Sequence, residues 1–174
     1  MAVAITALAF TIGSFWWLNA RRGSLRLVGR PRSFALSSSG NRLALNVPLS
    51  LHNTGPTSVW LINAHLSFAE DDMPLSLPFV ATRPGVLPTS DDSRPWATQL
   101  VLAGRESRVI CCEFVADMKA PLQLVAGDKH ATLTIVEHRS WGRERTRALG
   151  PIVLHITDQV IATQHSYIAH DNFA

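Results

Sequence analysis

Charged side chains are absent from the first eighteen residues after the initiator methionine, Ala2 to Asn19. At about 1.5 Å rise per residue, a helix of this length spans roughly 27 Å, close to the roughly 30 Å of a bilayer's hydrocarbon core. The segment also lacks a polar face, which argues against an amphipathic helix buried in a soluble domain. The sequence therefore predicts a membrane-spanning helix, with Phe15, Trp16 and Trp17 at the lipid–water interface.

The segment does not have the pattern of a cleaved signal peptide, because its positive charges follow the apolar stretch instead of preceding it. Leu18-Asn19-Ala20 is also a poor match to a cleavage site, and we therefore favour a retained anchor over a cleaved signal. Arg21 and Arg22 begin a basic collar directly after the span, and basic residues beside a span stay on the cytoplasmic side. The expectation is a single-pass protein of the cell inner membrane whose main domain is cytoplasmic.

Acidic residues are missing from residues 1 to 69, which contain six arginines. The rest of the chain has ten basic and thirteen acidic residues, so the net charge of +3 originates in the N-terminal part. A nucleic-acid-binding protein normally carries its basic surface on the folded domain, and this distribution argues against nucleic acid as a partner. A basic collar beside a span instead favours the anionic headgroups of the membrane lipid bilayer.

Cysteine is scarce: the chain has only Cys111 and Cys112, and adjacent cysteines in an extended segment do not readily form an ordinary disulfide. Strand alternation places Cys112 on one face with Ile110 and Phe114, as a small core residue. The seven histidines are scattered, and no metal-binding spacing, phosphate-binding loop or Gly-X-Ser-X-Gly elbow occurs. We therefore expect no metal, no cofactor and no enzymatic activity, although a site assembled from distant residues would leave no local signature.

Downstream of the span, short segments of alternating apolar and polar residues are separated by Gly, Pro, Asn and Asp, which is the pattern of strands buried on one face. About seven strands are expected, and they favour a mainly β fold with two packed antiparallel sheets, an immunoglobulin-like β-sandwich. We divide the chain into an anchor with its collar at 1–22, a β-sandwich domain at 23–158 and a C-terminal tail at 159–174. The expected strands are 25–28, 43–51, 59–68, a short one near 75–80, 96–102, 107–115, 130–137 and 151–157.

Several local features carry their own expectations. Pro48 cannot donate to a strand ladder, which predicts an edge or a bulge at that residue. The serines of 37–40 are interpreted as a local turn or flexible joint. The apolar residues of the tail favour a last strand or short helix on the core over a partner-binding segment. In 59–68, strict alternation places on one face Trp60, Ile62, Ala64, Leu66 and Phe68.

The strand at 43–51 runs into Asn53-Thr54-Gly55, and the next strand begins at Val59. This arrangement resembles membrane-proximal immunoglobulin-like and LEA14-like domains, in which an alternating strand ends in Asn-Thr-Gly or Asn-Pro. A short span ending in Trp-Trp, followed by a basic collar and a sandwich, is also similar to uncharacterised small bacterial single-pass membrane proteins. The resemblance implies a fold and a membrane topology, and no catalytic residues.

A turn rich in arginine and tryptophan is expected between the strands at 130–137 and 151–157. Its candidate contacts with a partner protein or with lipid phosphates are Arg139, Trp141, Arg143 and Arg145, because Arg and Trp are enriched in binding hot spots. A solvated charged turn with the tryptophan folded back onto the sandwich is equally compatible with the pattern.

The leading functional hypothesis is a non-enzymatic accessory or scaffold subunit that binds a larger integral membrane protein complex through its anchor and its sandwich. Gly13 and Ser14 in the span are small enough to permit close helix packing. The alternative is a membrane-tethered ligand sensor, in which the acidic, proline-rich loop 70–94 forms the mouth of a pocket between the sheets. An enzyme with a site assembled from distant residues is the third possibility.

Overall fold

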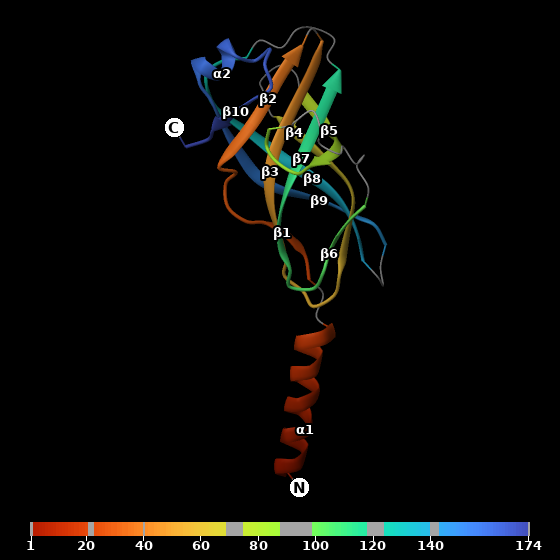
Figure 1. The fold of residues 1–174 in the computed structure, drawn as a ribbon. Helices are drawn as coiled ribbons and strands as arrows, with labels where there is room; N and C mark the ends of the chain where they lie inside the picture. Colours follow the sequence, from red (N-terminus) through yellow and green to blue (C-terminus); the bar gives the residue numbers. More distant parts are fainter. Residues whose placement is uncertain are drawn as a thin grey trace.

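The structure, a computed structural model, describes residues 2–20, 23–39, 41–68, 75–87, 99–117, 124–139 and 143–173. A helical rod stands apart from a β domain (Figure 1). The rod is α1 (Ala2–Phe15), continued by the π-helix η1 (Trp16–Ala20). The domain contains β1 (Leu25–Leu27), β2 (Ser33–Ser39), β3 (Arg42–Asn53), β4 (Val59–Phe68), β5 (Leu75–Arg83), β6 (Leu100–Leu102), β7 (Ser107–Asp117), β8 (Gly127–Arg139), β9 (Arg145–Ile156), α2 (Asp158–Ala162) and β10 (Ile168–Asp171).

The strands form one curled antiparallel sheet in the order β10-β2-β3-β7-β5-β4-β8-β9, with β1 added to β3 and β6 added to β4. β5 joins the two halves of the sheet, because it pairs with β4 up to Pro78 and with β7 from Phe79 onward. Both halves contribute alternate apolar side chains to one core, including Leu45 and Phe114 from one half and Leu133 from the other. The predicted mainly β, antiparallel class is confirmed, and the described strands number ten instead of about seven.

Two of the additional strands, β2 and β10, pair with each other. The turn predicted for the serines of 37–40 is wrong, since Ser37–Ser39 belong to β2. Phe34, Leu36 and Ser38 are all buried on this strand. Because serine is polar, the apolar alternation that indicates a strand is not apparent in the sequence. The tail is folded onto the domain, as expected, by α2 and β10, and Val160 of α2 is 1% exposed in the core.

The face predicted for β4 is wrong in its first half, where Val59 and Leu61 are buried and Trp60 is exposed. The pairing of β4 with β8 shifts register between Leu61 and Asn63, which is a β-bulge. One extra residue reverses the alternation, so the buried set continues beyond the bulge at Ala64. Such a shift is not visible in an alternating sequence.

β3 is paired along its length with β7, and its other side is shared by two strands. β2 pairs with β3 up to Asn46, and β1 pairs from Leu51 onward. Pro48 lies in the gap between these two pairings, where a strand tolerates a residue without an N–H. After β3 the chain turns at 54–58 and enters β4 in the other half of the sheet.

The two ends of the sheet order are joined through Asn172, which is 1% exposed. Its side-chain amide donates to the carbonyls of Val153 in β9 and of Pro31, both at 2.8 Å, and its Oδ1 accepts from the amide of His155 at 2.7 Å. Its own backbone amide donates to the Arg32 carbonyl at 2.8 Å. Asn172 therefore occupies part of the outer edge of β9 as the next strand of a ladder would.

His170 of β10 is 7% exposed and packs against the ring of Phe34, with 5.7 Å between centroids. Burial lowers the pKa of His170 below its ordinary value, so the unfolded chain binds a proton at a higher pH than the folded chain. We therefore expect stability to fall as the pH drops through about 6.5 toward the lower folded-state pKa, by at most about 1.4 kcal/mol per pH unit.

Urea unfolding of the full chain at pH 7.5, 6.5 and 5.5 checks this expectation. His170→Leu is expected to remove this loss of stability at low pH. His65→Leu, which replaces a half-buried histidine, is the control and is expected to keep it. An unchanged pH dependence in His170→Leu would contradict it.

Candidate functional site

The N-terminal helix buries none of its residues against the domain that follows. Ala2–Asn19 has a mean hydropathy of 1.4 over 18 residues, which is long and apolar enough to cross a membrane. Length and composition of this kind belong to membrane anchors and equally to N-terminal signal sequences. Phe15, Trp16 and Trp17 are all exposed at the end of the helix nearest the domain, whereas Arg21 and Arg22 lie outside the described residues.

Three polar side chains of the helix donate hydrogen bonds to its own backbone. The hydroxyls of Thr6 and Thr11 donate to the carbonyls four residues earlier at 3.0 and 2.8 Å, and the amide of Asn19 donates to the Phe15 carbonyl at 3.1 Å. A helix in hydrocarbon must satisfy its polar groups internally, because no water is available there. These three residues are therefore compatible with the membrane span that the sequence predicts.

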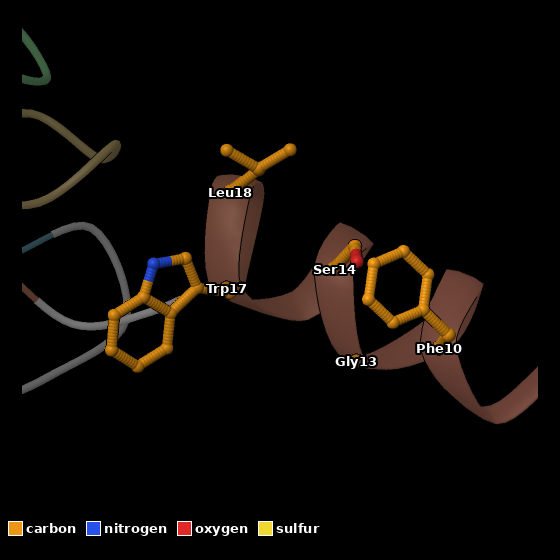
Figure 2. Close-up of a pocket in the computed structure, with 5 residues that line it drawn as sticks. All are labelled: Phe10, Gly13, Ser14, Trp17 and Leu18. Atoms are coloured by element: carbon orange, nitrogen blue, oxygen red, sulfur yellow. The ribbon is translucent and has the colours of Figure 1, made fainter.

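A groove of about 400 Å³ lies on one side of the helix, with Gly13 and Ser14 between Phe10 and Trp17 (Figure 2). Leu18 completes its lining. Gly13 has no side chain, and a Cβ built on it meets nothing within 4 Å. Since the β domain contributes no residue to the groove, the helix presents a small-residue surface that its own chain leaves open.

The end of the β domain nearest the helix is a cluster of three turns, formed by residues 23–24, 53–58 and 103–106, which we call the turn cluster. Asn53, fully buried, lies at its centre. Its side-chain amide donates to the carbonyls of Thr57 at 2.8 Å and Ala103 at 2.9 Å, and its Oδ1 accepts from the amide of Gly55 at 3.1 Å. One side chain thus connects the turn after β3 with the turn after β6.

The segment that follows the helix is held by the same cluster. Ser24 and Thr54 exchange backbone and side-chain hydrogen bonds, with Ser24 N donating to Thr54 Oγ1 at 3.0 Å and Thr54 N donating to Ser24 O at 3.1 Å. Gly104 is required on steric grounds, since a Cβ there would overlap the backbone of Pro56. Ser24, just before β1, is therefore held against the turn that follows β3.

Arg105 connects the turn cluster directly to the helix. Its Nη2 donates to the carbonyl of Leu18 at 2.7 Å, while its backbone amide donates to Gly55 O at 2.8 Å. The last carbonyls of a helix lack intrahelical partners and carry a partial negative charge, so an arginine is a favourable partner for them. The sequence marked 103–105 only as a turn, and nothing local indicated that Arg105 reaches back to residue 18.

The arginine-rich turn predicted to make partner or lipid contacts is described in part. Trp141 lies outside the described residues, and Arg139 is placed as a backbone position in β8. Arg143 and Arg145 are exposed. The structure therefore leaves this candidate contact untested.

The described part of the chain holds no cluster of metal-binding side chains. Within the described ranges no group of three His, Cys, Asp or Glu residues is arranged to hold a metal ion, and both acidic clusters at 70–72 and 91–92 lie outside them. Burial raises the pKa of Cys112 to about 12, with the neighbouring Cys111 adding to the effect. Cys112 is thus a buried thiol of low reactivity, on the core face predicted for it.

No family model matches the chain, and no curated protein is similar to it in sequence. Among solved structures, that of a Bordetella pertussis protein described as an ApaA protein is similar over 78% of this chain and 96% of that chain. The two share 12% sequence identity with a TM-score of 0.43. We draw no conclusion about function from a likeness at this level.

Proposed function

We propose that this chain is a single-pass protein of the inner membrane and a non-enzymatic accessory subunit of a larger integral membrane protein complex. The observation that carries the proposal is the groove at Gly13, which the β domain leaves uncovered. Small residues at the surface of a membrane helix let a second helix backbone approach closely, and such surfaces drive association inside bilayers. The partner is then a membrane helix of the complex.

Retention of the helix is supported by its contacts with the folded domain. A cleaved signal sequence is removed from the mature protein, so it does not need a contact with the folded domain. Here the Leu18 carbonyl accepts a hydrogen bond from Arg105, a residue of the turn cluster. Arg21 and Arg22 follow the span at once, and they favour a cytoplasmic β domain held close to the membrane surface.

The family resemblance belongs to the same proposal. In the membrane-proximal domains that this segment resembles, an alternating strand ends in Asn-Thr-Gly or Asn-Pro, and here Asn53 organises the turn cluster next to the helix. The alternative role as a ligand sensor requires a pocket at loop 70–94, of which residues 70–74 and 88–94 lie outside the described residues. The helix groove, whose residues are all described, therefore supports the accessory role.

Purification of the full chain from its native membranes in mild detergent tests the proposal. We expect an integral membrane protein to co-purify in stoichiometric amount and to be reduced at least about tenfold by Gly13→Leu, because a side chain there fills the groove. The matched control is Ala4→Leu, nine residues away and thus about 180° around the helix, which is expected to leave the complex intact. Isolation of the wild-type chain alone, or equal retention by Gly13→Leu, would contradict the accessory role.

A further inference from the structure

A second pocket, of about 330 Å³, lies between β1 and β9. In the described part of the chain β1 pairs with β3 and β9 pairs with β8, and no ladder joins β1 to β9 although the two strands are in contact. The pairing of β9 with β8 shifts register between Ala131 and Leu133, opposite Gly150 and Pro151, which both line the pocket. The pocket is therefore a gap in the curled sheet, left open between two strand edges.

Two arginines are among the residues that line this pocket, Arg26 from β1 and Arg147 from β9. Arg26 is exposed, and among the described residues it makes no hydrogen bond or ion pair. Arg147 is 26% exposed and has one ionic contact, 3.9 Å from Nη1 to Glu137 Oε1, which is longer than a hydrogen bond. Its Nη1 is buried without a hydrogen-bond partner.

Glu137 is the acidic group facing this arrangement, and its side chain is fully buried. It therefore neutralises part of the charge of Arg147 from the interior of the domain, and its carboxylate does not reach the pocket surface. Two arginines against one buried carboxylate give the pocket a net positive charge. Arginine presents its N–H groups in a planar fork that matches phosphate oxygens in pairs, which makes phosphate the anion best suited to such a site.

The pocket lies at the membrane end of the β domain. Leu25, one of its lining residues, follows Asn19 of the helix by six residues, so at most roughly 21 Å of chain separates them. β1 is placed near the lower end of the domain, toward α1 (Figure 1). At this position the pocket is accessible both to the headgroup of an anionic lipid and to a soluble phosphorylated compound.

We propose that the gap between β1 and β9 is a binding site for a phosphate group, held by Arg26 and Arg147. This site goes beyond the accessory role, since it requires only the folded domain and its two arginines. A phosphate bound between β1 and β9 would connect the edges of these two strands, which are not joined by any described backbone pairing. Glu137 then acts as a positioning residue that keeps the guanidinium of Arg147 at the base of the pocket.

The test uses the purified full chain in a neutral detergent, without any partner protein. Dissociation constants are measured for short-chain phosphatidic acid and for inorganic phosphate, with short-chain diacylglycerol as the phosphate-free control. Arg26→Gln removes an exposed side chain and is not expected to affect folding. Arg147→Lys keeps the charge beside Glu137 and removes the planar fork. Arg42→Gln removes one exposed arginine at the other end of β3 and is the matched control for net charge.

We expect phosphatidic acid to bind saturably, and Arg26→Gln and Arg147→Lys each to raise its dissociation constant at least tenfold, with Arg42→Gln within twofold of the wild type. Competition by inorganic phosphate would support the site and assign it to the phosphate group alone; lack of competition would support it as a lipid headgroup site. Absence of saturable binding by either probe, or equal weakening by Arg26→Gln and Arg42→Gln, would overturn it. Because no partner is present, this result is independent of the co-purification experiment.

Discussion

Replacing Asn53 by alanine is expected to lower the free energy of unfolding by about 3 kcal/mol, since its three shortest side-chain hydrogen bonds, at roughly 1 kcal/mol each, are lost. The amide of Gly55 would be left buried without its acceptor, and the carbonyls of Thr57 and Ala103 would lose a shared donor. The turns after β3 and β6 would then no longer be connected through one side chain. Urea unfolding of the full chain in detergent, followed by near-ultraviolet circular dichroism, measures the change.

The control for this prediction is Asn41→Ala, which alters an exposed asparagine in the turn before β3. Surface changes of this kind stay within about 0.5 kcal/mol of the wild type. Equal stability of the two variants would show that the hydrogen bonds of Asn53 do not organise the turn cluster.

Placing a charge in the middle of the helix, by Ile12→Arg, is expected to move the protein out of the carbonate-resistant membrane fraction. An arginine at the centre of a membrane span costs about 2.5–3.5 kcal/mol on insertion scales, which is on the order of a 100-fold shift in the insertion equilibrium. Ile12 is exposed on the helix, so the substitution leaves the core of the β domain untouched. Fractionation of cells producing each variant measures the effect.

Ile12→Leu serves as the control and is expected to remain fully in the membrane. An intact mass that includes Ala2, measured on the protein extracted from membranes, distinguishes a retained anchor from a cleaved signal. If Ile12→Arg stays in the carbonate-resistant fraction, another part of the protein holds it to the membrane.

Regular periodicity accounts for what could be predicted from the sequence. In β3 and β7 the apolar residues of one face follow a period of two, so the buried positions of Leu45, Ile110 and Phe114 were predictable, whereas the buried Asn46 and Glu113 of the other face were not. β2 was missed because Ser38 occupies a buried position that alternation assigns to an apolar residue. The bulge after Leu61 in β4 reversed the faces of that strand, because register depends on the partner strand and not on local sequence.

Features of the candidate sites that lie within one segment could be predicted from the sequence, and contacts between distant residues could not. The apolar N-terminal helix and its small residues Gly13 and Ser14 form one contiguous segment, so the sequence was sufficient to predict the helix. Other features bring together residues that are far apart in the chain. Arg105 contacts Leu18, and Arg26 and Arg147 line one pocket. Their proximity results from closure of the sheet, and no local motif encodes it.

Closure of the sheet also determines when the domain can be completed during synthesis. β2 is made soon after the helix, yet its partner β10 follows by well over a hundred residues, and so does Asn172. At 5–20 residues per second, the ribosome needs on the order of 10 s to make the intervening chain. During that interval one side of β2 is without its final neighbour, and this open strand edge is the one that a shielding protein would have to cover.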